Sequence, residues 1–454
     1  MKPASASTSV HNVRFAQATI SFFERFMPDP FVLGILVTVV IAVVTLTFVP
    51  GVTVAQLIKG WHDGLFDILL FEFQIILVLV TSHAFSHAPI VQRVLKVCVS
   101  VARTPAEAAI VTFILVGIAS FWNWGLGLVA GAVFAREIAR RMRIDYAWVV
   151  AAGYSGWVVW GSGISGSIVL SVSTPGSSMN IVEKVTGQVL PISATAFAGF
   201  NLIPTIVMLC LMPLVIVWLR PGDEDVVVLE TDRYPDEPPP ERRKRHPTFA
   251  QKVENSWLGT AFIAAAGLGF LWLALQQKVA FGGINAVIFV LFIGGVILHG
   301  SPIAYAEAAK TGARQAASMM LVYPLYGGIM GMMGAAGLSA IVSRFFVAVS
   351  SAHTLPFWSY VCSLIITFFI PSGGGHWAVQ GPFVVPAAVT LHASMPATAM
   401  AVAMGEQVSD MMQPFWAAPV VAMAGIGVQR VLGFTMMTFL VGLIVYGAAL
   451  LLLV

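Results

Sequence analysis

Runs of apolar residues dominate the chain, with short polar segments between them. Six runs without a charged residue reach or approach the roughly 20 residues that a helix needs to cross a bilayer; they are 31–49, 196–219, 257–275, 282–298, 316–333 and 431–454. A seventh run, 65–85, contains Asp67, Glu72 and His83 and is a further predicted span. With the interrupted segments described below, the pattern predicts an all-α polytopic membrane protein with about nine spans.

The composition excludes the soluble classes of protein. Of the 454 residues, 58% are hydrophobic and 10% are charged, whereas soluble proteins carry roughly 25% charged residues. The polar side chains that would cover a soluble enzyme, a nucleic-acid binder or a disordered scaffold are missing. Cys98, Cys210 and Cys362 lie far apart in apolar runs, which predicts core packing rather than a disulfide framework or a metal knuckle.

The distribution of basic residues predicts the orientation, because basic residues remain on the cytoplasmic side of short loops. With segment 1–30 placed in the cytoplasm, 20 of the 24 lysines and arginines fall inside, and the opposite orientation reverses that bias. The four that fall outside are Lys59, Lys184, Lys278 and Arg344. Segment 220–255, with its proline run, is then a cytoplasmic linker, and 256–281 is a connecting span.

Two segments are predicted to form re-entrant hairpins. Segment 106–138 lies between basic loops of the same face, and its apolar arms of 10 to 16 residues meet at 122–125. Such arms reach only about 15 to 24 Å into a core of about 30 Å, so this hairpin should enter from inside and turn near mid-membrane. Segment 356–391 should enter from outside. Its arms meet at 371–376, where three consecutive glycines disfavour a helix and predict a turn.

The order of these parts repeats, which predicts an inverted repeat. Each half, 31–219 and 282–454, contains a span, a polar loop, a second span, an amphipathic stretch, a hairpin, an interrupted helix and a last span. Asn123 and Ser372, at the two hairpin tips, lie 249 positions apart (372 minus 123). The connecting span makes the second half start from the opposite face. Secondary transporters use such repeats and bind substrate near the midplane at the repeat interface.

The interrupted helices mark the predicted binding site. Glycine and serine loosen the helix at 161–167, and Pro414 removes a donor from the helix before it. Paired interruptions point to a transport site, with close helix packing as the alternative for the first. Because tips and breaks lack lysine and arginine, backbone amides and polar side chains should hold a small anion. The predicted substrate-binding residues are Asn123, Gly125, Ser162, Gly163, Ser165, Ser372, Gly373, Gly374, His376, Gln407 and Gln413.

Carboxylates within the membrane helices predict ion coupling. Glu406 and Asp410 are four residues apart and share one helix face just before the second break. Ionisable residues at membrane depth are functional candidates, so we expect this pair to bind a proton or a sodium ion, with Asn123 and Ser372 as further ion-coupling residues. A helix cap is the alternative role for Asp410. No metal other than sodium is predicted.

Motifs for enzymes and cofactors fail in their context. Gly161, Gly163 and Gly166 have the spacing of a dinucleotide fingerprint, but membrane helix flanks them where a strand is required. His83 and His87 have the spacing of a zinc pair but lack its catalytic glutamate. We therefore predict no enzyme activity and no bound cofactor.

Several motifs resemble those of one known family. They are Pro-Ser-Gly-Gly-Gly-His-Trp-Ala-Val-Gln-Gly-Pro at 371–382, Gly-Glu-Gln at 405–407, Gln-Pro-Phe-Trp at 413–416, Asn-Trp-Gly-Leu-Gly-Leu-Val at 123–129 and Phe-Ala-Arg-Glu at 134–137. On these motifs the chain resembles the bacterial short-chain fatty acid transporter family, the permease type found with acetoacetate degradation.

The resemblance implies a carrier similar to the sodium–dicarboxylate and aminobenzoyl-glutamate transporters, which have two re-entrant hairpins, form dimers and use an elevator motion. Several of those relatives carry Ser-Asn-Thr at their hairpin tips, which this chain lacks, so the coupling ion stays open between sodium and proton. We expect a homodimeric inner-membrane symporter of short-chain monocarboxylates such as acetoacetate or butyrate, embedded in the lipid bilayer, with no nucleic-acid partner. A channel for small anions or neutral solutes is the alternative, because re-entrant loops also build pores.

Overall fold

The computed structural model describes residues 28–222, 224, 226–228, 248–277, 282–413, 416–417, 420–421, 426 and 428–454. Within these residues the chain is helical and contains no β-strand. Six stretches are long and apolar enough to cross a membrane: Phe31–Phe48, Val54–Ser86, Pro105–Trp122, Gly199–Trp218, Phe249–Gln276 and Arg430–Leu452. The all-α polytopic class is therefore confirmed, while the count of about nine spans stays a prediction. Most of the predicted N-terminal segment and linker, and Pro414, lie outside the described residues.

The first half of the chain folds into a series of helices, of which α3 (Val54–Asp67) occupies the segment where a polar loop was predicted. Asp29 caps the first of them by accepting a hydrogen bond from the Phe31 backbone N–H at 2.9 Å. The elements are α2 (Pro30–Phe48), α3 (Val54–Asp67), α4 (Leu69–Ser86), α5 (Pro89–Val99), α6 (Pro105–Trp122), α7 (Trp124–Arg141), α8 (Tyr146–Gly156), the 3-10 turn η1 (Trp157–Val159), α9 (Ser167–Ser173), α10 (Ile181–Thr186), η2 (Ile192–Ala194) and α11 (Gly199–Trp218).

The second half follows α12 (Phe249–Glu254) and α13 (Trp257–Gln277). The elements are α14 (Gly283–His299), α15 (Pro302–Ala335), α16 (Leu338–Val349), α17 (Leu355–Ile366), α18 (Gly373–Leu391), α19 (Met395–Ser409), the 3-10 turn η4 (Asp410–Met412) and α21 (Val428–Leu452).

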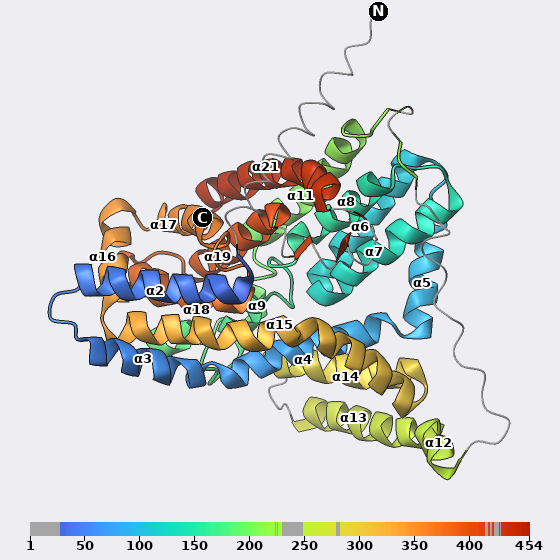
Figure 1. Ribbon diagram of the computed structural model, residues 1–454, viewed down its shortest axis with the longest axis horizontal. Coiled ribbons are helices and arrows are strands. Elements are labelled where there is room, and N and C mark those ends of the chain that lie inside the picture. The colour runs from blue at the N-terminus through green and yellow to red at the C-terminus, as the bar shows by residue number, and fades with distance from the viewer. Residues whose placement is uncertain are drawn as a thin grey trace, which may run out of the picture.

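Glycines bring the long helices of the two halves into close contact. Gly60 and Gly64 of α3 face Gly331 and Gly327 of α15, and a Cβ added to Gly60 would lie 2.8 Å from the Gly331 carbonyl oxygen. Small residues at such spacing let helix backbones approach closely. Because the earlier glycine of α3 meets the later glycine of α15, the two helices run antiparallel here. Figure 1 shows α15 lying along both α3 and α4.

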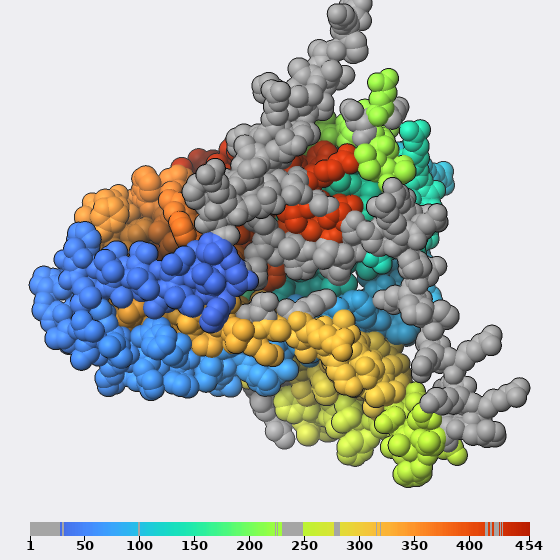
Figure 2. Space-filling view, viewed as in Figure 1, coloured from blue at the N-terminus to red at the C-terminus, as the bar shows by residue number. Residues whose placement is uncertain are grey.

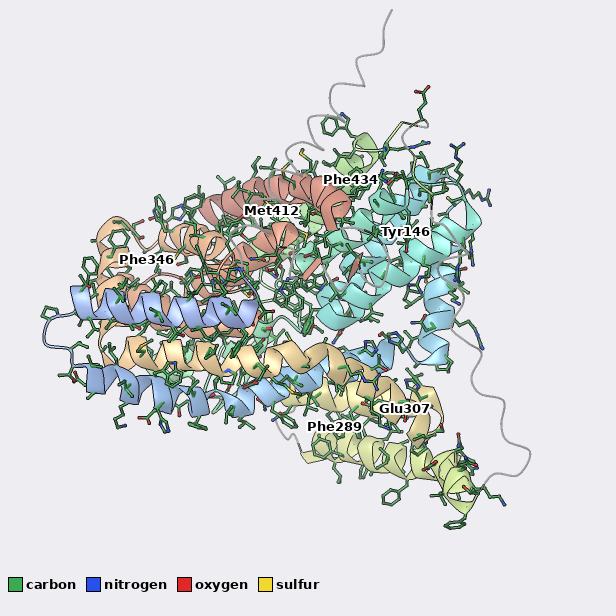
Figure 3. The ribbon with its side chains drawn as sticks, viewed as in Figure 1. Tyr146, Phe289, Glu307, Phe346, Met412 and Phe434 are labelled. Carbon is green, nitrogen blue, oxygen red and sulfur yellow. The ribbon has the colours of Figure 1, made fainter. Side chains whose placement is uncertain are left out.

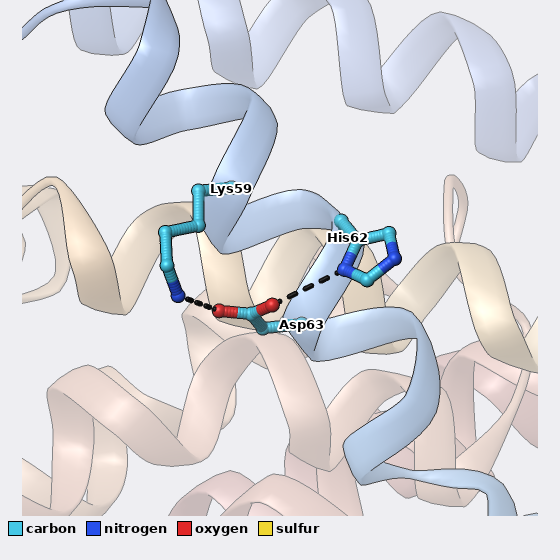
Figure 4. Close-up of polar contacts among 3 residues, drawn as sticks. All are labelled: Lys59, His62 and Asp63. Carbon is cyan, nitrogen blue, oxygen red and sulfur yellow. Dashed lines mark hydrogen bonds and ion pairs between the residues drawn. The ribbon is translucent and has the colours of Figure 1, made fainter.

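The opposite face of α3 is polar and exposed. Asp63 binds Lys59 and also the His62 ring, whose Nδ1 lies 3.1 Å from Asp63 Oδ1 (Figure 4). On α15 the exposed Lys310 similarly pairs with Glu307 at 2.7 Å. These charges explain why hydropathy predicted a span only at 65–85, whereas the helical stretch runs from Val54 to Ser86.

The outermost helices keep most of their apolar surface exposed. Only 17% of the apolar window is buried in α2, and the same share is buried in the stretch that contains α13. Figure 2 shows α2 at the front of the molecule and α13 along the lower margin. Exposed apolar helix faces of this extent fit contact with lipid. In Figure 3, Met412 of η4 is labelled in the upper part of the molecule, near α19 and α21, which η4 contacts, whereas Glu307 lies at the lower right.

The helices α6 and α7 form the first hairpin and meet at Asn123. This residue is the single extended position (φ −150°, ψ 113°) between them and is 5% exposed. Each arm has 18 residues and so reaches about 27 Å. The predicted arm lengths of 10 to 16 residues were wrong, because the polar last turns of α7, up to Arg141, were counted as loop.

The second hairpin consists of α17 and α18, connected by residues 367–372. The sequence predicted that the chain turns at the three glycines. Instead, Gly373, Gly374 and Gly375 form the first turn of α18, and the chain turns just before them. The physical reason for the glycines is close packing. A Cβ on Gly374 would lie 2.6 Å from the Phe71 ring, and one on Gly375 would collide with the Tyr326 ring.

Candidate functional site

The first break contacts α19 through a reciprocal pair of hydrogen bonds. The Ser162 backbone N–H donates to Gln407 Oε1 at 2.8 Å, and Gln407 Nε2 donates to Ser162 Oγ at 2.8 Å. Both residues are fully buried, and Asn201 Nδ2 from α11 donates to the Ser162 carbonyl at 2.9 Å. Ser162 and Gln407, two predicted site residues from opposite halves of the chain, therefore lie together. Their side chains hydrogen-bond to each other rather than remaining open for a substrate.

The tip of the first hairpin is attached to the same break. Asn123 Oδ1 accepts a hydrogen bond from Leu126 N at 2.8 Å and so caps α7, whereas Asn123 Nδ2 is buried with no partner in the described part of the chain. The next residue, Trp124, donates its backbone N–H to Ser165 Oγ at 2.9 Å. Gly125 packs against Ser82 of α4. The tip is therefore held in the interior with one amide donor unused.

Gly163 completes this attachment. Its Cα faces the Phe121 backbone so closely that a Cβ would collide with it, and the next residue, Ile164, donates its N–H to the Phe121 carbonyl at 2.9 Å. Glycine at this position thus serves close backbone approach. The alternative of close packing at the first break describes Gly163 well, and the same contact brings the break to the hairpin tip.

The second hairpin tip contacts two tryptophans, Trp160 and Trp416. Gly373 packs against Ser167 of α9 and against the ring of Trp160, and the Pro371 carbonyl accepts a hydrogen bond from Trp416 Nε1 at 3.0 Å. Ser372, the residue between them, is 5% exposed, and its hydroxyl has no partner that meets hydrogen-bond geometry among the described residues.

His376 and Gln413 stabilise the second hairpin from within. His376 Nε2 lies 2.6 Å from Gln380 Oε1, and its Nδ1 lies 3.3 Å from Thr367 Oγ1. Gln413 Nε2 donates to the Thr367 carbonyl at 2.8 Å. The structure therefore places these two predicted substrate-binding residues at the connection between α17 and α18, where their polar atoms bind the chain itself.

Two acidic residues lie together at the end of α19. Asp410 Oδ2 accepts from Trp160 Nε1 at 3.1 Å, and the Tyr154 hydroxyl donates to the Asp410 carbonyl at 2.8 Å. Glu406 Oε1 and Asp410 Oδ1 are buried without a hydrogen-bond partner within the described ranges. The Asp410 side chain thus binds Trp160 from the first half of the chain, and no helix-capping bond of this side chain is found in the described residues.

No buried lysine or arginine in the described part of the chain balances these acids. Burying a carboxylate is costly unless it is paired, protonated or bound to a cation. Glu72 of α4 is a third buried acid, and Tyr323 of α15 lies close enough to both Glu72 and Glu406 to interact with their charges. Acidic groups from both halves therefore lie near Tyr323.

Four tryptophan rings form a closed circuit beside the acids. The ring centroids lie 6.4 Å apart for Trp124 and Trp160, 5.2 Å for Trp160 and Trp157, 5.3 Å for Trp157 and Trp416, and 6.0 Å for Trp416 and Trp124. Sequence reasoning missed Trp157 and Tyr154. Their spacing of three residues with Trp160 on one helix face was the signal that could have found them.

Groups of three kinds gather in this buried region. It offers unused donors at the first hairpin tip, unpaired acids on α19 and η4, and aromatic rings between them. Among the described residues no group of three or more histidine, cysteine, aspartate or glutamate side chains is arranged to hold a metal ion.

Comparison with known families settles which proteins the chain is related to. The family model described as Short chain fatty acid transporter matches residues 12–453. The chain belongs to the short chain fatty acid transporter family. Two family relatives are each described as "Putative short-chain fatty acid transporter". The one from Escherichia coli strain K12 is 36% identical over 425 residues, which are 93% of this chain and 95% of the relative. The one from Haemophilus influenzae strain Rd is 33% identical over 428 residues, which are 93% of this chain and 96% of that relative.

A solved structure shares the fold of this family member. The YdaH transporter of Alcanivorax borkumensis matches with a TM-score of 0.60 over 93% of this chain and 98% of that chain, at 12% sequence identity. At that identity the likeness concerns the fold alone. Membership in the family confirms the resemblance read from the motifs and makes the chain a multi-pass membrane transport protein rather than an enzyme.

Proposed function

We propose that this family member is a secondary active transporter of short-chain monocarboxylates, such as acetoacetate and butyrate, coupled to a sodium or proton gradient. The observation that carries the proposal is the convergence of both hairpin tips, the first break and the end of α19 on one buried region. Secondary transporters place substrate and ion at such a junction of discontinuous helices between two repeats. The names of the relatives supply the substrate class.

Three features support re-entrant hairpins within an inverted repeat. The helix order of the first half recurs in the second. The equivalent helices α3 and α15 pack antiparallel along their glycines, as an inverted pair would. Asn123 and Ser372 at the tips are buried, whereas a loop between two complete spans would emerge at the membrane surface.

The substrate site is proposed at the first hairpin tip. Asn123 Nδ2 is a buried donor with no acceptor within the described chain, and the carboxylate of a short acid would supply one. The buried Ser372 hydroxyl, which lies beside the Tyr323 side chain, is the second group. Backbone and neutral side-chain donors give a weak anion site, which suits a carrier that must release its substrate.

The coupling ion is proposed to bind at Glu406 and Asp410, whose unpartnered oxygens need a proton or a cation. From the resemblance and the distribution of basic residues we further propose a homodimer in the bacterial inner membrane with a cytoplasmic N-terminus. An elevator motion would then move the hairpins and α19 against a scaffold that contains α3, α4 and α15.

Transport by the purified full chain in proteoliposomes tests the proposal. A carrier should accumulate labelled butyrate above its external concentration when a sodium or pH gradient is imposed. Butyrate that only equilibrates, whatever the gradient, would instead identify the alternative, a channel. Asn123→Ala and Ser372→Ala should lose uptake while the protein remains folded, and Asn255→Ala at the exposed end of α12 is the matched control.

A further inference from the structure

Trp124 at the first hairpin tip is fixed through its backbone. Its N–H donates to Ser165 Oγ at 2.9 Å, and its carbonyl accepts from Trp157 Nε1 at 2.9 Å. The side chain is 2% exposed. These bonds hold the indole in one place at the point where the hairpin meets the first break.

The indole N–H of Trp124 has no acceptor within the described residues, although it is buried. The other three tryptophans of the circuit each have one. Trp157 donates to the Trp124 carbonyl, Trp160 to Asp410 Oδ2 and Trp416 to the Pro371 carbonyl. Indole nitrogen is a donor only, and a buried donor without an acceptor costs free energy. The chain therefore presents a fixed donor that calls for an acceptor from outside.

A second unused donor stands next to it in the sequence. Asn123 Nδ2 is also buried and unpartnered within the described chain, while the Oδ1 of the same side chain is occupied by capping α7. Both donors belong to the first hairpin tip, and a carboxylate is an outside group with two acceptor oxygens that can serve such donors. The apolar faces of the tryptophan circuit suit a short alkyl tail and offer no hydrogen bond to a second carboxylate.

We infer that Trp124 is a substrate-binding residue whose indole N–H, together with Asn123 Nδ2, binds the carboxylate of the transported monocarboxylate. This inference rests on the proposed function and adds a residue to its binding site. An ordered water at the indole N–H is the competing occupant, since buried waters commonly satisfy such groups.

Trp124→Phe tests the inference because it removes the N–H and keeps an aromatic ring. Since that N–H forms no bond within the described protein, the variant loses only ring volume and should lose no more thermal stability than Trp377→Phe, which shrinks a buried ring equally and also breaks a hydrogen bond. Half-maximal butyrate uptake should require about tenfold more butyrate or more. Trp377→Phe is the matched control: it also removes a buried indole N–H, which binds the Met179 carbonyl at 2.9 Å, and should stay within about twofold of wild type.

Binding is measured separately from transport, by the thermal stabilisation that butyrate gives the purified protein. If the wild-type protein binds butyrate but does not accumulate it, the carrier proposal is overturned. The butyrate affinity of Trp124→Phe then still decides whether the indole N–H binds the carboxylate. Equal butyrate affinity in Trp124→Phe and wild type would overturn the inference alone and assign the N–H to water. Wild-type protein that neither binds nor transports butyrate would overturn both.

Discussion

The bond pair between Ser162 and Gln407 joins the first break to α19 and should dominate the stability of that junction. Both residues are fully buried, and their two hydrogen bonds measure 2.8 Å each. Gln407→Met keeps the length of the side chain and removes both bonds. It leaves the Ser162 backbone N–H without an acceptor, which is the costlier loss.

The magnitude follows from counting these groups. A buried hydrogen bond contributes about 0.5 to 1.5 kcal/mol net, and a buried group left without a partner costs about 1 to 3 kcal/mol. Gln407→Met should therefore reduce the free energy of unfolding by about 2 to 4 kcal/mol. Ser162→Ala removes only the hydroxyl bond and should cost about 1 to 2 kcal/mol. The double variant should cost less than the sum, by about 1 kcal/mol, because the shared bond is lost once.

Equilibrium unfolding of the purified variants in mixed detergent micelles measures these differences. Gln92→Met is the matched control, because Gln92 is half-buried and forms a single bond, to the Ser86 carbonyl at 2.8 Å. It should cost about 1 kcal/mol or less. A Gln407→Met variant as stable as wild type, or a double variant that is strictly additive, would refute the reasoning and return Gln407 to a role in direct substrate binding.

Two further predictions concern the helix contacts around the site. Gly64→Ala should weaken the packing of α3 on α15 and lower thermal stability, because its Cβ would collide with the Gly327 carbonyl, whereas Gly334→Ala has open space and should be neutral. Asp145→Ala should cost about 2 to 4 kcal/mol, since its buried carboxylate binds the N–H of Trp148 and of Val227 and the Arg430 side chain. Asp63→Ala, at an exposed carboxylate, should leave the unfolding midpoint nearly unchanged. Unfolding midpoints measure both predictions. Equal losses in Gly64→Ala and Gly334→Ala would contradict the packing argument, and equal losses in Asp145→Ala and Asp63→Ala would contradict the argument from buried hydrogen bonds.

Hydropathy predicted much of the fold, because an apolar run is a local signal. The runs 31–49, 196–219 and 257–275 correspond to α2, α11 and α13 within a few residues. It failed for α3 and for the first part of α15, where Lys59 and Glu307 form exposed ion pairs on one face while the other face packs. A helix with a polar outer face and a glycine contact face lacks the average hydropathy of a span.

The candidate site was predictable in its parts but not in its pairing. Asparagine, serine and glycine at the tips and the first break mark irregular backbone, and this signal is local. The partner of each group is not local: Ser162 and Gln407 are 245 positions apart, and Trp160 and Asp410 are 250 apart. The three glycines from Gly373 were interpreted as a turn because propensity disfavours them in a helix, yet the surrounding aromatic rings leave no room for a Cβ.

The positions of the unpartnered groups predict that substrate and ion bind cooperatively. Donors without partners among the described residues lie at the first hairpin tip, at Asn123 and Trp124, and carboxylate oxygens without partners lie at Glu406 and Asp410. A carboxylate substrate alone would add negative charge where no buried lysine or arginine is found in the described chain, and uncompensated buried charge is costly. A cation or proton on the acids offsets that cost, so the bound ion should raise the affinity for the substrate. By linkage, the bound substrate raises the affinity for the ion by the same factor.

Reciprocal titrations measure this coupling. Sodium or acidic pH should strengthen butyrate binding, and butyrate should strengthen binding of the same ion equally. Glu406→Gln should remove the effect because it takes away one acid while keeping the shape of the side chain, and Glu254→Gln, in the short helix α12 far along the chain from the site, is the control that should retain it. If butyrate affinity in the wild-type protein depends on neither sodium nor pH, the acids do not couple the ion to the substrate, and their burial must have another cause.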